Sequence, residues 1–306
     1  MAKQKLIGGV AAGVAILIVI SILYFQIPES EDDVLLNDEI KTEVIETEKT
    51  QIDFLGDSPI FRLFIYEDHI GILPNGESYI LEIQAEFKSG LEEVYDEISV
   101  LNERQNSVVI FPIFTSSAYS LYPIDISDRD YGFYDYYEGL CDGPITWAGD
   151  CLTTQIKPDI PKTHNASGMG HEILDLLGYD IITDIDVDKN PEILKRYDKV
   201  ILLHNEYVTK TEFNAITNHP KVLYLYPNAL YAEVSVDYEE NTISLVRGHN
   251  YPDPEIRNGF GWEFDNTPME YDELCENWEF YNIDNGMMLN CYPEEIIYKD
   301  VKFLKT

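Results

Sequence analysis

The chain is poor in positive charge. Its 306 residues include 21 lysines and arginines against 56 aspartates and glutamates, which gives a formal net charge of −35. A field of this sign repels phosphate groups, so nucleic acid and anionic lipid headgroups are disfavoured as partners of the folded part. The same surface suits solubility in salty water and the attraction of cations.

Cysteine is scarce as well, with four residues and no C-x-x-C spacing. That absence argues against a zinc ribbon or a thioredoxin-type redox site. No cysteine stands between a predicted strand and a helix, where a nucleophile would be expected. The four residues form two close pairs, Cys141 with Cys151 and Cys275 with Cys291. In an exported domain this pattern predicts two structural disulfides.

Charge is missing altogether between Leu6 and Phe25, a stretch of 20 apolar or uncharged residues. At about 1.5 Å of rise per residue a helix of this length crosses a hydrocarbon core of about 30 Å. A cleaved signal peptide is the alternative, but its apolar region is usually about 7–15 residues and ends in a small-residue cleavage site. Lysines before the segment and acidic residues after it predict a single-pass anchor in the cytoplasmic membrane, with the amino terminus inside. Gly9 and Gly13 form a GxxxG pattern that could join two such helices in a homo-oligomer.

The stretch after the apolar segment lacks aromatic side chains. Residues 29 to about 52 are rich in Glu, Asp, Lys and Thr and offer little apolar surface to bury. We therefore expect a stub and anchor over 1–26 and a flexible acidic linker over 27–53. The remainder, 54–306, carries all three tryptophans and most of the tyrosines and phenylalanines, and it predicts an extracytoplasmic folded domain.

Short apolar runs alternate with helix signals between 107 and 236. Four runs have the pattern of buried strands: 107–114, 179–183, 199–203 and 222–226. Three helix signals lie between them: an amphipathic pattern over 167–177, Asn190 before Pro191, and a capping box of Thr209 and Glu212. The alternation predicts an α/β core whose parallel sheet is covered by helices on both faces. The segments 54–106 and 237–306 are β-rich flanks.

Polar side chains follow three of these strands. In an open parallel sheet, ligands bind beyond the carboxyl ends of the strands. Those ends are 115–119, 204–207 and 227–231. His204 and Glu206 could hold a metal or perform acid–base chemistry there. The alternative is that both side chains cap the next helix and bond to loop backbone.

The segments DVDKNPEILKRYDKVILLHNEYVTKTEFNAI and VLYLYPNALYAEV resemble the carboxy-terminal domain of the large subunit of the N,N-dimethylformamidase family. The resemblance covers about residues 107–236 and includes FPIFTSSAY upstream. It implies a class I glutamine amidotransferase-like fold, which is a flavodoxin-like three-layer α/β fold with a parallel sheet.

The resemblance also implies a single iron, held by two tyrosines and a glutamate, that polarises an amide and activates water. By position, Glu206 and Tyr119 would be metal ligands, and His204 and Asn228 would be catalytic or substrate-contacting groups. The second tyrosine has four candidates in DRDYGFYDYYEG: Tyr131, Tyr134, Tyr136 and Tyr137. Iron or another divalent metal is then the expected cofactor.

Three further features have more than one interpretation. Asn165 begins the N-x-S sequon of the chain, which predicts a glycan or a helix cap. The aspartates of TDIDVDKN alternate like a calcium loop but lack the glycine and distal glutamate of an EF-hand, so we expect an acidic turn. The segment 247–267 contains three side chains that could reach the cleft of Glu206: His249, Arg257 and Asp265.

Two classes of function are consistent with these features. The first is a non-catalytic surface protein in which an amidohydrolase-like domain binds or scaffolds, and the acidic surface and single anchor suit it. The second is a metal-dependent hydrolase that acts outside the cell on a small amide or other C–N bond. Either class has a small molecule as an expected ligand. A tightly held metal that is lost when Glu206 is changed would distinguish the second class from the first.

Overall fold

The computed structural model describes residues 50–53, 58–72, 78–80, 82–99, 106–119, 133, 151–157, 167–264 and 275–306. Several predictions lie outside these residues: the anchor between Leu6 and Phe25 with its GxxxG pattern, Cys141, the sequon at Asn165, and the tyrosines at 131, 134, 136 and 137. Within the described ranges, no helix has both the length and the apolar character that crossing a membrane requires.

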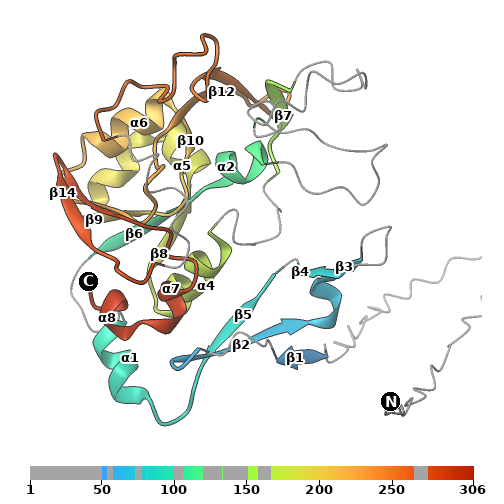
Figure 1. Ribbon diagram of the computed structural model, residues 1–306, viewed down its shortest axis with the longest axis vertical. Coiled ribbons are helices and arrows are strands. Elements are labelled where there is room, and N and C mark those ends of the chain that lie inside the picture. The colour runs from blue at the N-terminus through green and yellow to red at the C-terminus, as the bar shows by residue number, and fades with distance from the viewer. Residues whose placement is uncertain are drawn as a thin grey trace, which may run out of the picture. The chain divides into compact units, whose positions relative to one another are not determined.

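A six-stranded sheet forms the centre of the α/β fold, with the order β14-β15-β11-β9-β6-β8 (Figure 1). Its strands are β6 (Ser107–Phe111), β8 (Asp180–Thr183), β9 (Lys199–Leu202), β11 (Val222–Tyr224), β14 (Phe280–Ile283) and β15 (Gly286–Leu289). All neighbours are parallel except the edge pair β14 and β15. The predicted parallel strands are therefore confirmed, and the sheet as a whole is mixed because a carboxy-terminal hairpin joins it.

Both faces of this sheet are buried, which explains why its strands are apolar without alternation. Every residue of β6 is buried. Val108 and Ile110 pack into one hydrophobic cluster, while Val109 and Phe111 pack into a second cluster on the opposite face. Because successive side chains of a strand point to opposite faces, the two clusters lie on the two sides of one sheet.

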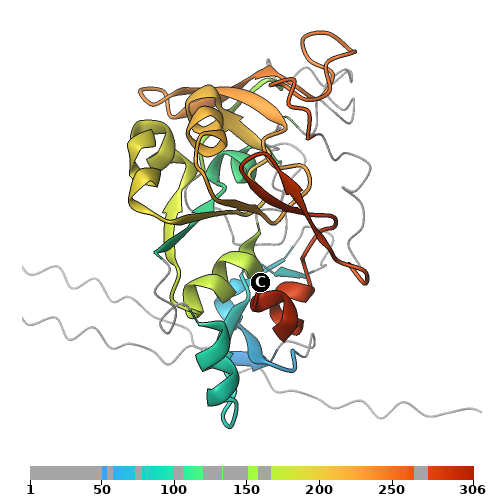
Figure 2. The same ribbon diagram turned by 90° about the vertical axis from the view of Figure 1, so that its left-hand side faces the viewer.

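Helices cover both faces, as Figures 1 and 2 show. The first cluster, which contains Val108, includes residues from α5 (Asp184–Lys189), the 3-10 helix η6 (Pro191–Arg196) and α6 (Lys210–Thr217). The second cluster includes residues from α4 (Gly168–Leu176), α7 (Ile296–Lys299) and α8 (Val301–Leu304). The predicted helix starts at Pro191 and after Thr209 are confirmed, but the Asn190 side chain makes no cap and the Glu212 carboxylate does not complete the predicted capping box.

The segment TDIDVDKN is a helix and not the acidic turn that we expected. Thr183 caps α5: its hydroxyl accepts the backbone N–H of Asp186, and the Asp186 carboxylate accepts the backbone N–H of Thr183. This reciprocal pair satisfies two donors at the helix start. In a helix Asp184 and Asp188 are four residues apart and share a face, so the alternation of a calcium loop does not occur.

The chain after β6 also differs from the prediction. We expected a strand over 107–114, but it ends at Phe111, and the Thr- and Ser-rich segment after it forms the short buried helix α2 (Ile113–Ala118). The Ser117 hydroxyl donates to the carbonyl oxygen of Ile113 one turn earlier, so it does not compete with the helix. The helix α2 therefore lies between the end of β6 and Tyr119.

Smaller sheets and one more helix complete the fold. One sheet has the order β10-β12-β13-β7, with β7 (Thr153–Gln155), β10 (Tyr207–Thr209), β12 (Ala232–Asp237) and β13 (Thr242–Arg247). A second contains β1 (Gln51–Asp53), β2 (Phe61–Tyr66) and β5 (Gln84–Phe87), and a third pairs β3 (Ile70–Ile72) with β4 (Ser78–Ile80). The 3-10 helix η1 (Glu67–His69) precedes β3, and α1 (Glu92–Ile98) follows β5. Because β1 pairs with β2, regular structure begins inside the segment that we expected to be linker.

One of the two predicted disulfides is described and confirmed. Cys275 and Cys291 are bonded, with their Cα atoms 5.3 Å apart. The bond joins the segment before β14 to the segment after β15, so it closes the hairpin that extends the sheet. Cys151 is also disulfide-bonded, and Cys141 lies outside the described residues.

Candidate functional site

Two neighbouring strands of the central sheet position the candidate site. β6 pairs with β8 on one side and with β9 on the other, so the strand order reverses at β6. Tyr119 follows β6 through α2, and Glu206 follows β9 by four residues. The carboxyl ends of the strands at such a reversal form the crevice in which α/β proteins bind ligands.

Backbone hydrogen bonds fix the segment that carries Glu206. The backbone N–H of His204 donates to Ser167 Oγ over 2.7 Å, and that of Tyr207 donates to Thr115 Oγ1 over 3.1 Å. The carbonyl oxygen of Glu206 accepts the backbone N–H groups of Tyr231 and Ala232, each over 2.9 Å. Ser167 stands at the start of α4 but does not cap the helix with its side chain, and its hydroxyl accepts the backbone N–H of His204 instead.

The Glu206 carboxylate lies at the centre of a buried polar cluster. Tyr119 Oη donates to Glu206 Oε2 over 2.6 Å. His204 Nε2 lies 3.3 Å from the same oxygen, and His249 Nε2 lies 2.6 Å from Oε1. Glu206 is 1 % exposed, and the two histidines are 4 % and 5 % exposed. Both carboxylate oxygens thus have partners in a site from which water is largely excluded.

Electrostatics at this cluster favour an ionised carboxylate. Burial by itself raises the pKa of Glu206, but the attraction of His249 and the hydrogen bonds from both histidines outweigh it. The pKa of Glu206 therefore lies well below its ordinary value. Burial, and after it the charge of Glu206, raises the pKa of Tyr119, so the phenol stays protonated and donates to the carboxylate.

Aromatic rings surround His204, and an amide lies beside it. The imidazole stacks on Tyr226 with ring centroids 5.0 Å apart, and the edge of Tyr292 approaches it at 5.5 Å. Asn228 Nδ2 donates to His204 Nε2 over 2.8 Å, and Glu206 Oε2 lies 3.3 Å from the same nitrogen. Among the described residues, Asn228 Oδ1 is a buried acceptor without a hydrogen-bond partner. Such an atom is unusual in a folded protein and points to a missing donor.

The structure brings together the four side chains that the sequence singled out: Tyr119, His204, Glu206 and Asn228. Of the three considered in 247–267, His249 reaches the cluster, whereas the Arg257 side chain is exposed and only its carbonyl oxygen contacts the His249 backbone. Asp265 lies outside the described residues. Tyr226 and Tyr292 were missed, because an apolar strand and a residue next to Cys291 carry no local signal of a site.

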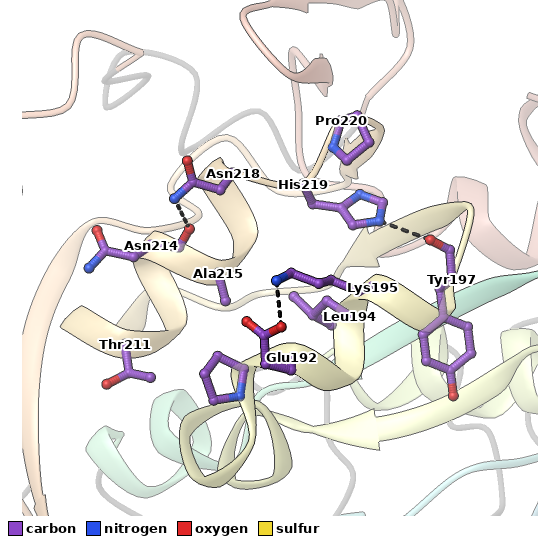
Figure 3. A pocket seen from close by; sticks show the side chains of 11 residues that line it. Glu192, Leu194, Lys195, Tyr197, Thr211, Asn214, Ala215, Asn218, His219 and Pro220 are labelled. Carbon is purple, nitrogen blue, oxygen red and sulfur yellow. Dashed lines mark hydrogen bonds and ion pairs between the residues drawn. The ribbon is translucent and has the colours of Figure 1, made fainter.

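The described residues give two limits on where a ligand binds. No group of three or more His, Cys, Asp and Glu side chains in this part of the chain has an arrangement that could hold a metal ion. A site built on tyrosine oxygens and one carboxylate needs fewer such side chains. A surface cavity of about 690 Å³ lies between η6 and α6. Figure 3 shows two interactions along its wall: Lys195 pairs with Glu192, and His219 contacts the carbonyl oxygen of Tyr197. None of its lining residues belongs to the Glu206 cluster.

No protein-family model and no curated protein matches this chain. The case for a function therefore rests on the cluster itself. Its side chains include an ionised carboxylate, a phenol, two imidazoles and an amide, all in a buried setting. These groups can bind a cation, hold a polar small molecule and move a proton.

Proposed function

We propose that this chain is a membrane-anchored, extracytoplasmic α/β protein whose Glu206 site binds a metal ion and hydrolyses a small amide or related C–N bond. The 2.6 Å contact between Tyr119 Oη and Glu206 Oε2 carries the proposal. These side chains are 87 residues apart in the chain. The resemblance to N,N-dimethylformamidase implies that both side chains are ligands of one metal. Two such ligands must lie side by side, and the contact between them supports this role.

Strand order supports the flavodoxin-type fold that the same resemblance implies. The parallel strands β8-β6-β9-β11-β15 correspond, in chain order, to 2-1-3-4-5. That order is the one found in flavodoxin-type doubly wound sheets, in which ligands bind where the strand order reverses. Tyr119 and Glu206 follow the two strands at this position.

The donor chemistry of the site fits a metal such as iron. Glu206 offers carboxylate oxygens and Tyr119 a phenol oxygen, and both are hard oxygen donors. Metal ligands must be deprotonated, and the low pKa of Glu206 meets this requirement at neutral pH, whereas Tyr119, whose pKa is raised here, would have to lose its proton to the binding metal. One more phenol lies close by, since the ring centroids of Tyr119 and Tyr207 are 6.3 Å apart.

The residues around these ligands have separate tasks in the proposed reaction. A bound metal would polarise the amide carbonyl and activate water. Asn228 Oδ1, the buried acceptor without a partner, would receive an N–H group of the substrate. His204 Nε2 accepts the Asn228 amide N–H, so it is the unprotonated ring nitrogen and would take a proton from the attacking water. The rings of Tyr226 and Tyr292 shield His204 from water.

A second candidate is a non-catalytic binding protein, and one observation favours it. Both oxygens of Glu206 already contact Tyr119 or a histidine, so the carboxylate is satisfied without a metal. A buried ion-pair cluster of this kind can serve folding specificity alone. In that case the anchor would display an acidic domain that binds a small molecule on the outer face.

Metal content distinguishes the two candidates. The full chain is purified in detergent without chelator, offered iron or zinc, and compared with Glu206→Gln and with Glu192→Gln, a carboxylate 69 % exposed in a surface pair. About one metal per chain in the parent and in Glu192→Gln, but none in a folded Glu206→Gln, supports the metal site. Amine release from small amides by the loaded parent then tests hydrolysis. A parent that stays empty overturns the proposal in favour of the binding protein.

A further inference from the structure

His249 is brought to Glu206 by a loop that lies outside the segment with family resemblance. The loop follows β13, and its backbone is closed by paired hydrogen bonds between Gly248 and Tyr251, each over 2.9 Å. The His249 N–H donates to the carbonyl oxygen of Arg257 over 2.9 Å, and the Asn250 N–H donates to that of Ile256 over 2.8 Å. The backbone around His249 is therefore anchored on both sides.

Three consecutive residues of this loop have left-handed backbone conformations, with φ of 123° at Gly248, 50° at His249 and 65° at Asn250. A side chain at Gly248 would place its Cβ 2.9 Å from Ala232 Cα, so glycine is needed there. A histidine in the left-handed region is uncommon and strained. Residues held in such conformations cluster at functional sites, where the surrounding structure maintains the strain.

Two aromatic rings orient the His249 imidazole. Tyr207 stacks on it at 5.1 Å with an interplanar angle of 25°, and Tyr231 lies 4.7 Å away at 53°. The ring directs Nε2 to Glu206 Oε1, 2.6 Å away. Tyr119 occupies the other carboxylate oxygen, Oε2. His249 and Tyr119 thus face the two oxygens of one carboxylate.

The two histidines of the cluster are not equivalent. His204 Nε2 is 3.3 Å from Glu206 and is closer to Asn228, at 2.8 Å, so it is already engaged by the amide. His249 Nε2 has Glu206 as its near neighbour. His249 Nε2 is thus the nitrogen best placed to bind a metal together with the oxygens of Glu206 and Tyr119.

We propose that His249 Nε2 is a third protein ligand of the metal at Glu206 and Tyr119, an inference that rests on the proposed function. The family resemblance implies a second tyrosine in this role. One imidazole nitrogen with one carboxylate and one phenol suits iron or another first-row transition metal. It does not suit calcium or magnesium, which take oxygen ligands.

Pulsed electron paramagnetic resonance of the iron-loaded full chain tests this assignment, because an imidazole bound to the metal modulates the electron spin echo through its remote ring nitrogen. Four proteins are compared: the parent, His249→Asn, His204→Gln and His219→Gln. Asparagine tolerates the left-handed backbone of position 249, so the loop is retained. His219 is a matched control, since it is buried and its ring nitrogens contact the backbone carbonyl groups of Lys221 and Tyr197, away from the cluster.

We expect imidazole modulation in the parent, His204→Gln and His219→Gln, and its loss in His249→Asn together with an iron affinity at least tenfold weaker. Iron binding without imidazole modulation in the parent, or modulation that persists in His249→Asn, overturns the assignment and leaves the proposed function in place. A parent that binds no iron overturns both. If His249→Asn does not fold, His204→Gln decides the assignment. Imidazole modulation that survives in His204→Gln supports His249 as the ligand, and loss of the modulation in that variant refutes the assignment.

Discussion

Replacement of Glu212 by glutamine is expected to stabilise the protein at neutral pH. Glu212 is fully buried on α6, and neither of its carboxylate oxygens has a hydrogen-bond partner among the residues that the structure describes. It faces Asp184 and Asp188 of α5. Asp184 accepts the backbone N–H groups of Phe114 and Ile185, and Asp188 accepts the hydroxyls of Thr209 and Tyr238, so both aspartates are satisfied where Glu212 is not.

The pH dependence of this effect follows from the direction of the pKa shift. Burial raises the pKa of Glu212 most, and repulsion by Asp184 and Asp188 raises it further. The Thr209 backbone opposes the shift without forming a full hydrogen bond. A folded-state pKa above the unfolded value means that, between the two values, the native state keeps a proton on Glu212 that the unfolded state has lost. Stability is therefore complete below the unfolded pKa of about 4.3 and falls as pH rises toward the folded pKa.

The size of the effect is set by one proton. Between the two pKa values the free energy of unfolding of the parent falls by about 1.4 kcal/mol per pH unit for this group, and Glu212→Gln removes that loss. In a folded unit of this size, each 1 kcal/mol shifts the melting temperature by about 2–4 °C. The variant should thus gain stability relative to the parent as pH increases above 5, until the folded pKa of Glu212 is passed.

Guanidinium unfolding of the full chain at pH 5, 6, 7 and 8 measures this difference. Glu192→Gln, at an exposed carboxylate, is the control and should stay within about 0.5 kcal/mol of the parent at every pH. A difference between Glu212→Gln and the parent that does not grow with pH, or a variant less stable than the parent at pH 8, would refute the reasoning.

Three other outcomes are expected. Glu206→Gln should cost about 3–5 kcal/mol at pH 7 by leaving buried histidines without their partner. Because the folded pKa of Glu206 is lowered, the stability that this carboxylate contributes is present above about pH 4.3 and is lost as pH falls. The difference in unfolding free energy between the parent and Glu206→Gln should therefore narrow in unfolding curves at acid pH, and a difference that stays constant contradicts this. Gly286→Ala should destabilise by ~3 kcal/mol or more in thermal unfolding, since its Cβ would lie 1.8 Å from Val222 O across β11 and β15; an unchanged melting temperature would be inconsistent with the register of that pair. Replacing Cys275 and Cys291 by serine opens a loop of 16 residues and should cost about 3 kcal/mol, measured by urea unfolding with and without reductant. The parent should lose at least as much on reduction, because the disulfide of Cys151 opens too, and no loss in either protein argues against the bond.

Local patterns in the sequence were sufficient to predict the central strands and several helices. The run at 107–111 is apolar throughout because both faces of β6 are buried, and this signal is independent of distant residues. The start of α6 was predictable because Thr209 accepts the N–H of Glu212 within one turn. At α5 the same capping chemistry was present at Thr183 and Asp186, but it was obscured by the alternating aspartates.

Features that depend on long-range pairing were not predictable. β15 joins the sheet beside β11, more than sixty residues earlier, and no local pattern specifies that partner. The meeting of Tyr119 with Glu206 was anticipated only through family resemblance and strand-end geometry. His249 was one of three possible side chains, and its selection depends on a left-handed backbone conformation that its neighbours impose.

The most direct test of the metal site is the visible absorption of the iron-loaded full chain. A phenolate bound to ferric iron gives a charge-transfer band, so the account predicts visible colour in the parent, with one iron per chain. Tyr119→Phe should lose most of that absorption, whereas Tyr224→Phe, a buried tyrosine bonded to Asn285 and outside the cluster, should keep it. Iron bound without such a band, or a band unchanged in Tyr119→Phe, would contradict the assignment of Tyr119 and Glu206 as the metal site.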